Sequence, residues 1–158
     1  MGASGWDYRV PYQPDAEAAF THLQDHVLES GEFLWREEYY GPRPTTRWQL
    51  AAIKDREEFW EEGTHSILDM DRIVAADDED HDGTLRPLTP DKVRQYFGTD
   101  RPTEADFDRV YLYTPGTDMR EWARRRLHAD LRRWSGRFTI LYDGGQPQQI
   151  IFFGFSGD

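Results

Sequence analysis

Residues 137–155 read RFTILYDGGQPQQIIFFGF, and this stretch decides the fold. Two runs rich in β-branched and aromatic residues flank Gly144 and Gly145, a turn signal that predicts a β-hairpin. The adjacent Phe152 and Phe153 point to opposite faces of such a strand. We therefore expect a sheet that is covered on one face and is partly exposed or packed by helices on the other.

A helix over residues 118–135 is predicted immediately before the hairpin. Asp118 with Glu121 three residues later is a capping signature, and Gly136 supplies a helix end. The apolar residues recur at helical spacing and form one stripe that ends at Trp134. This stripe needs a cover, so we expect it to lie on the hairpin with Trp134 buried. The hairpin residues expected beneath it are Ile140, Ile150 and Phe152.

Gly, Pro and capping residues divide the rest of the chain. The expected strands span residues 6–12, 33–40 and 66–74, and the expected helices span residues 15–31, 46–63 and 89–98. Residues 75–83 are too acidic and too rich in turn residues for either element, which predicts an exposed loop. No parallel βαβ alternation is sustained. This order indicates an α+β fold with a mainly antiparallel sheet of about four to six strands and about three or four helices.

The length of 158 residues fits a single domain over residues 1–158, because one hydrophobic core serves chains of about 100 to 200 residues. The aromatic content of 15% is too high for a disordered chain. The N-terminal sequence MGASGWDYRVPYQPD has neither the basic nor the apolar segment of a signal peptide, and no window approaches the length of a membrane span. We expect a cytoplasmic protein that does not bind membranes.

Thirty acidic and nineteen basic side chains give a net charge of −11. Such a surface repels nucleic-acid phosphates and attracts cations, so we expect a basic protein partner and no nucleic-acid binding. The chain has no Cys, which excludes disulfides, thiolate nucleophiles and cysteine-based zinc sites. Only Lys54 and Lys92 are lysines, so the other 17 of the 19 basic residues are Arg, a bias that favours a GC-rich bacterial source.

The segment EEGTHSILDM, residues 61–70, contains the candidate catalytic residues. His65 follows a predicted helix end, where Glu62 and the terminal carbonyls would favour the imidazolium form, and Asp69 would orient one ring nitrogen. This set is compatible with general acid or base chemistry in a metal-independent isomerase or hydrolase. The alternative interpretation is a histidine that only hydrogen-bonds to the carbonyls of a helix end.

The segment DDEDHDG, residues 77–83, contains the candidate partner-binding carboxylates. They are Asp77, Asp78, Glu79, Asp80 and Asp82. We expect this loop to present negative charge to a basic protein. The alternating aspartates before Gly83 also match the start of a calcium loop, but Thr89 stands where a bidentate carboxylate is needed, so no dedicated metal site is predicted. Trp6 and Tyr8 are core residues by default and would join the partner interface if they are exposed.

Two further groups of side chains have both a functional and a structural interpretation. Arg124 and Arg125 belong to an arginine-rich part of the predicted helix and are candidates for weak anion binding, because guanidinium groups bind anions in a bidentate manner. The favoured alternative is a polar helix face paired with local carboxylates. His22 and His26 have the spacing of two metal ligands on a helix, but no third ligand accompanies them, and we expect a solvated flank.

No phosphate-binding loop, dinucleotide-binding glycine motif, nucleophile elbow or zinc-protease motif is present. A small, acidic, cysteine-free α+β domain with many aromatic residues suits a protein that binds and neutralises a basic protein. In size and charge, but in no motif, the chain resembles bacterial immunity proteins of toxin systems, and this resemblance implies an inhibitor. The alternative is a small enzyme or ligand-binding protein that uses His65 with Glu62 or Asp69. We expect no cofactor in either case.

Overall fold

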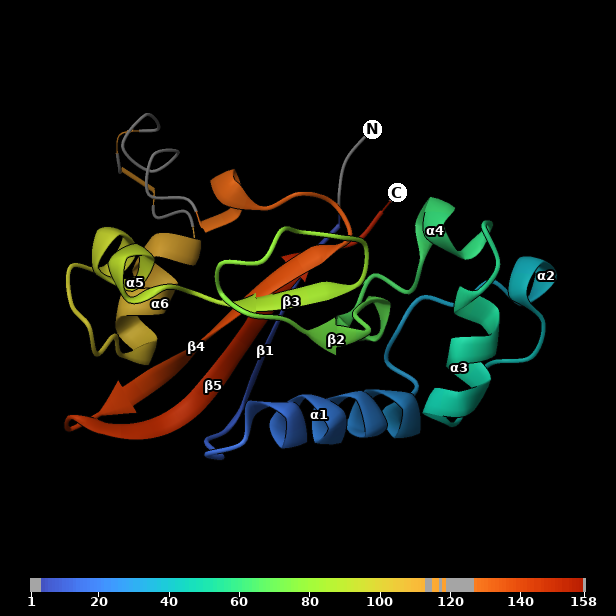
Figure 1. The fold of residues 1–158 in the computed structure, drawn as a ribbon, viewed down its shortest axis with the longest axis horizontal. Helices are drawn as coiled ribbons and strands as arrows, with labels where there is room; N and C mark the ends of the chain where they lie inside the picture. The colour runs from blue at the N-terminus through green and yellow to red at the C-terminus, as the bar shows by residue number, and fades with distance from the viewer. Residues whose placement is uncertain (1–3, 113–114, 117, 119–126, 158) are drawn as a thin grey trace.

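A five-stranded mixed sheet forms the centre of the fold (Figure 1). Its strands are β1 (Gly5–Pro11), β2 (Arg72–Ile73), β3 (Thr84–Pro87), β4 (Ser135–Asp143) and β5 (Gln146–Phe155). Their spatial order is β1-β5-β4-β3-β2. The long strands β1, β5 and β4 pair antiparallel, whereas the short strands β3 and β2 continue the sheet in parallel. The predicted α+β class and the C-terminal hairpin are confirmed.

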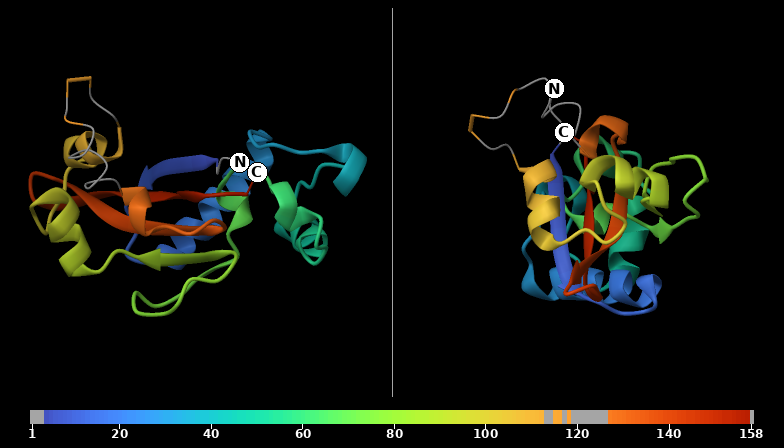
Figure 2. Two further views of the ribbon diagram at one scale, coloured as in Figure 1. Left: turned by 90° about the horizontal axis from the view of Figure 1, so that it is seen from above. Right: turned by 90° about the vertical axis from the view of Figure 1, so that its left-hand side faces the viewer.

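The computed structural model describes residues 4–112, 115–116, 118 and 127–157, and six α-helices lie within these ranges. They are α1 (Ala16–Ser30), α2 (Glu37–Tyr40), α3 (Arg47–Lys54), α4 (Phe59–Glu62), α5 (Pro90–Phe97) and α6 (Glu104–Tyr111), with 3₁₀ turns η1 (Ile67–Asp69) and η2 (Leu127–Asp130). Helices α2, α3 and α4 gather at one end of the molecule, and α5 and α6 lie at the other (Figure 2). No helix among the described residues is long and apolar enough to cross a membrane.

Helices α1 and α5 begin and end where their capping residues predict. The Asp15 side chain accepts a hydrogen bond from the N–H of Glu17, and Gly31 ends α1 in the left-handed region at φ 70°. Thr89 caps α5, and Gly98 follows its last residue at φ 73°. These caps satisfy backbone groups that a helix leaves unpaired at its ends, which is why local sequence was sufficient to predict both helices.

Strand β5 is buried on both faces. Ile150 and Phe152 pack in one hydrophobic cluster with α1, α3 and η1. Ile151 and Phe153 pack in a second cluster with α5, α6 and η2. All four side chains are at most 2% exposed. The opposite orientations predicted for Phe152 and Phe153 are confirmed, and helices cover the second face.

The indole of Trp6 lies across the sheet over two glycines. Trp6 pairs with Gly154 of β5, which in turn pairs with Gly136 of β4. A Cβ atom on Gly154 would lie 2.5 Å from the Trp6 ring, and one on Gly136 would lie 2.6 Å from Leu85 and 3.0 Å from Trp6. Close packing therefore requires glycine at both positions. Gly136 is not the helix end that the sequence suggested.

The strand predicted over residues 33–40 is wrong, because its last four residues form the single helical turn α2. Trp35 Nε1 donates a hydrogen bond of 2.9 Å to the carbonyl of Gly41, the residue after this turn. The Tyr40 ring is buried and lies 5.9 Å from that of Phe59. Aromatic burial and this side-chain bond determine the local structure here, so the β propensity of the sequence is overridden.

The helix predicted over residues 46–63 is interrupted. Thr46 caps α3 as expected, but α3 ends at Lys54, and α4 begins at Phe59. Trp60 Nε1 donates to the Lys54 carbonyl at 2.8 Å, which satisfies a carbonyl that a continuing helix would have used. The break also places the Phe59 side chain entirely in the core.

Most of the strand predicted over residues 66–74 is also wrong, since only β2 pairs with the sheet. The Ser66 hydroxyl accepts from the N–H of Leu68 and begins the turn η1. The four consecutive residues 67–70 are all fully buried. In a half-buried strand, buried and exposed side chains would alternate. Residues 67–70 instead form a turn that directs successive side chains into the core.

Most of the helix predicted over residues 118–135 lies outside the described residues. The described end differs from the prediction, because Ser135 already belongs to β4. Trp134 has φ 63°; its N–H donates to the carbonyl of Phe155, and its own carbonyl accepts from the N–H of Gly83. Leu127 in this segment does pack on the hairpin, but on the face opposite to the predicted one. The hairpin residues in its cluster are Leu141, Ile151 and Phe153.

The Trp134 indole provides a test of this packing. It is 8% exposed, and its ring centroid lies 5.2 Å from that of Trp60. A Cβ atom on Gly63 would lie 2.6 Å from the indole, and one on Gly157 would lie closer still, so the ring packs directly against both glycines. Trp134→Ala should lower the free energy of unfolding by about 3–5 kcal/mol, the usual cost of emptying an aromatic core site. Urea unfolding measures this value. Trp48→Ala, at an 88% exposed position, is the matched control and should change it by less than about 0.5 kcal/mol. Equal effects of the two substitutions would contradict the described packing.

Candidate functional site

Asp69, a predicted catalytic residue, is the centre of a buried polar network. Its fully buried carboxylate accepts from the N–H and the hydroxyl of Thr64, both at 2.7 Å, and from the hydroxyl of Ser156. The Thr64 hydroxyl also lies 2.7 Å from that of Ser66. Burial raises the pKa of Asp69, and the hydrogen bonds from Ser156 and Thr64 oppose this rise. The network joins the residue after β5 to the turn before η1, so it serves the fold.

His65 and Glu62 do not converge on Asp69. Glu62 pairs with Arg36, whose Nη2 lies 2.7 Å from the carboxylate. His65 adopts φ 53°, and its buried Nε2 has no hydrogen-bond partner among the described residues. His65 does not line any of five surface cavities that the described residues form. This geometry gives the acid/base interpretation no support, because a general acid or base needs a substrate space beside it.

The raised pKa of Asp69 leads to a pH-dependent prediction. The folded state holds this proton more tightly than the unfolded chain, so wild type loses stability as the pH rises from about 4, the ordinary aspartate value, through the raised pKa. Asp69→Asn lacks this loss, and its stability relative to wild type should therefore increase with pH. Urea unfolding at several pH values measures the difference, with the exposed Asp7→Asn as the control for the lost charge. A relative stability that falls with pH would contradict the prediction.

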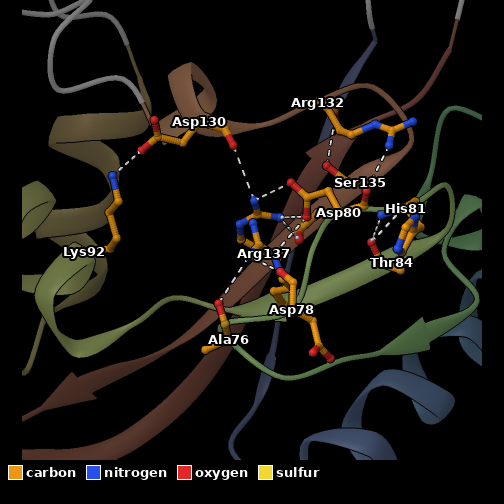
Figure 3. Close-up of polar contacts among 12 residues, drawn as sticks. Ala76, Asp78, Asp80, His81, Thr84, Lys92, Asp130, Arg132, Ser135 and Arg137 are labelled. Atoms are coloured by element: carbon orange, nitrogen blue, oxygen red, sulfur yellow. Dashed lines mark hydrogen bonds and ion pairs between the residues drawn. The ribbon is translucent and has the colours of Figure 1, made fainter.

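Asp80 holds the acidic loop, residues 75–83, against the sheet (Figure 3). Its carboxylate accepts two hydrogen bonds from Arg137, at 2.9 and 2.8 Å, and one from Arg86 Nε at 2.9 Å. The Asp80, Arg86 and Arg137 side chains are 12%, 20% and 7% exposed. Burial raises the pKa of Asp80, but the guanidiniums of Arg137 and Arg86 outweigh burial and lower it below the ordinary value.

The other predicted partner-binding carboxylates of the acidic loop face solvent. These are Asp77, Asp78, Glu79 and Asp82. Asp82 pairs with Arg132 at 2.7 Å. The Nη1 group of Arg86 donates to the carbonyls of Ala76 and Asp78, which ties the loop backbone to β3. The acidic loop is thus an anchored projection with one inward carboxylate and four outward ones.

Trp6 and Tyr8 do not share a surface with the acidic loop. They lie on β1, at one edge of the sheet, whereas the loop follows β2 at the opposite edge. Trp6 is 5% exposed, and Tyr8 is half-buried against the core. Their core interpretation is therefore the one that the structure supports. The predicted anion-binding residues Arg124 and Arg125 lie outside the described residues.

The Asp80 anchor can be tested by removing its charge. Asp80→Asn leaves two poorly exposed guanidiniums without their carboxylate and should lower the free energy of unfolding by about 3–5 kcal/mol at neutral pH. The difference should narrow in acid, because wild-type Asp80 loses its stabilising charge as the pH falls through its lowered pKa. Asp82→Asn in the same loop breaks an exposed pair and should cost at most about 1 kcal/mol. Chemical unfolding that gave both variants the same loss would exclude the anchor.

A second acidic feature, not predicted from sequence, is a cavity of about 340 Å³ between α2 and α4. We call it the acidic pocket, and it is lined by Arg36, Tyr39, Tyr40, Glu58, Glu61 and Glu62. Tyr39 is 64% exposed, whereas Tyr40 is buried with its hydroxyl 3.4 Å from the Glu58 carbonyl. Glu58 and Glu61 form no ion pair with any described residue, so Arg36 is the only cation lining three carboxylates. The acidic pocket combines an exposed ring with uncompensated negative charge.

A wide groove of about 740 Å³ lies between the C-terminal half of α1 and the start of α3. Its wall includes Trp48, which is the most exposed large apolar side chain among the described residues, at 88%. Asp25 and Glu29 line the groove from α1, and Arg47 pairs with Asp25 at 2.8 Å. Helix α3, which contributes to the wall of the groove, lies at the same end of the molecule as α2 and α4, the helices that line the acidic pocket (Figure 1).

Sequence patterns offered a signal for Trp48 but not for the acidic pocket. Trp48 falls on the side of α3 away from Leu50 and Ile53, the two residues that α3 buries. An apolar residue off the buried stripe indicates an exposed contact. The acidic pocket needs two single-turn helices that the sequence does not announce, since residues 33–40 resemble a strand and residues 59–62 resemble the continuation of a longer helix.

No family model matches the chain, and neither a curated protein nor a solved structure matches it. Within the described ranges, no cluster of three or more His, Asp or Glu side chains could hold a metal ion. His22 instead lies 3.2 Å from the side-chain nitrogen of Gln13.

Proposed function

We propose that this chain binds a basic protein partner and that the acidic pocket receives a cationic side chain of that partner. The observation that carries the proposal is the arrangement of the exposed Tyr39 ring beside Glu58 and Glu61, which have no cation of their own among the described residues. A guanidinium or ammonium group in this space would hydrogen-bond to carboxylates and contact the face of an aromatic ring. Both interactions favour cations.

Charge at longer range supports the same assignment. The net charge of −11 attracts cationic proteins, and the outward carboxylates of the anchored acidic loop add to that field without the need to order a free segment on binding. Exposed Tyr and Trp side chains are enriched at the centres of protein interfaces. We infer that the chain inhibits its partner by binding over the partner's functional surface, as an inhibitor of the immunity type would act in the bacterial cytoplasm.

The test begins with capture of the partner from the native host by the tagged chain, followed by identification with mass spectrometry. Tyr39→Ala should then weaken binding of the purified partner by about tenfold or more, as expected for a central aromatic contact. The double variant Glu58→Gln with Glu61→Gln should weaken it at least as much. Surface plasmon resonance measures both affinities, and circular dichroism confirms that the folds are retained.

A matched control separates the acidic pocket from net charge. The double variant Asp7→Asn with Glu17→Gln also removes two negative charges, but from exposed positions on β1 and α1. It should reduce affinity by less than about threefold. The association rate of wild type should fall at least about tenfold between low and high salt. Salt screens the attraction between the two proteins mainly while they diffuse together, so it lowers the association rate more than it raises the dissociation rate. Equal losses in the two double variants, or an association rate that ignores salt, would argue against this function.

A further inference from the structure

A small pocket of about 160 Å³ lies between β3, α5 and η2. Arg86 and Arg137, which bind Asp80, line part of it. Its polar lining consists of Arg86, Thr89, Lys92, Tyr96, Asp130 and Arg137. Figure 3 shows Asp130 between two cations, with Lys92 on its carboxylate and Arg137 on its backbone carbonyl. This space, which we call the cationic pocket, is separate from the acidic pocket at the other end of the molecule.

The charges around the cationic pocket do not cancel. Arg86, Arg137 and Lys92 contribute three positive charges, and Asp80 and Asp130 contribute two negative ones. Among the described residues around the pocket one positive charge remains, although the chain as a whole carries −11. Arg137 is only 7% exposed and shares the Asp80 carboxylate with Arg86, so two poorly solvated cations divide one negative charge. An anion in the pocket would complete the balance.

Hydrogen-bond donors remain available at the same place. Arg86 uses Nε and Nη1 on the acidic loop, and its Nη2 group has no acceptor among the described residues. Lys92 Nζ contacts the Asp130 carboxylate at 2.7 Å and carries further N–H groups. Tyr96 also donates to Asp130, and burial together with that carboxylate raises the pKa of Tyr96, so its hydroxyl is neutral.

We propose that the cationic pocket binds a small oxyanion, a compact carboxylate or phosphate group held by Arg86 and Lys92 beside the buried Arg137. A cavity of about 150 Å³ accommodates a molecule the size of benzene, which limits the ligand to a similar volume. Guanidinium and ammonium groups both form charge-assisted bonds to such anions. This inference does not depend on the proposed protein partner.

Charge variants on both sides of the pocket test the inference. Isothermal titration of wild type with inorganic phosphate, and separately with acetate, at constant ionic strength should show saturable binding of at least one of them in the millimolar range. Lys92→Gln should weaken that binding by about fivefold, which corresponds to about 1 kcal/mol. Asp130→Asn removes the competing carboxylate and should strengthen it by a similar factor. A cluster that serves only the fold would not yield opposite changes in affinity.

Arg94→Gln is the matched control, because it removes one positive charge from the same helix. Arg94 pairs with Asp91 and does not line the pocket. Its affinity should equal that of wild type, and the phosphate and acetate arms identify which anion is preferred. Circular dichroism establishes that all three variants are folded. The inference is overturned if neither anion binds wild type saturably, or if Lys92→Gln and Arg94→Gln weaken binding equally.

Discussion

The burial of β5 on both faces and its pairing on both edges constrain the rest of the structure. Ile150 and Phe152 require a cover on one side, and Ile151 and Phe153 require one on the other. Strands β1 and β4 satisfy its backbone groups along both edges. A strand in this position cannot slip by one residue, because every side chain would exchange faces. Helices α1, α5 and α6 are placed by this requirement.

Local signals predicted the elements that local interactions stabilise, such as the hairpin and the capped helices α1 and α5. The failures share one physical cause: a specific side-chain contact, and not the local propensity of the residues, determines the backbone. Trp60 Nε1 binds the last carbonyl of α3 and ends a helix whose residue pattern continues. Gly136 reads as a helix end but is a packing position beneath Trp6, which is distant in sequence. Neither contact can be read from residue type and periodicity, because each depends on how side chains pack in the folded protein.

The candidate sites show the same division. Exposure of the acidic loop followed from its composition, but the inward direction of Asp80 depends on Arg137, fifty-seven residues away. Asp69 was expected to orient His65, yet it accepts a hydrogen bond from the hydroxyl of Ser156, 87 residues away in the sequence. Residue type and spacing suggested which side chains are chemically capable. Only the tertiary structure shows which of these side chains already form hydrogen bonds or ion pairs within the protein.

The buried and half-buried Arg and Lys side chains among the described residues are each paired with a carboxylate. Arg137 and Lys54 are at most 9% exposed and each contacts a carboxylate, so part of the small supply of cations stabilises the interior and its margins. Each of these cations is balanced by the carboxylate that it contacts, so the excess negative charge of the chain, −11 in total, is carried by other side chains. Exposed ion pairs contribute little to folding, and an excess of like charge opposes the compact state. Some outward carboxylates still take part in exposed contacts of this kind, such as Asp82 with Arg132, whereas Glu58 and Glu61 form no ion pair with any described residue.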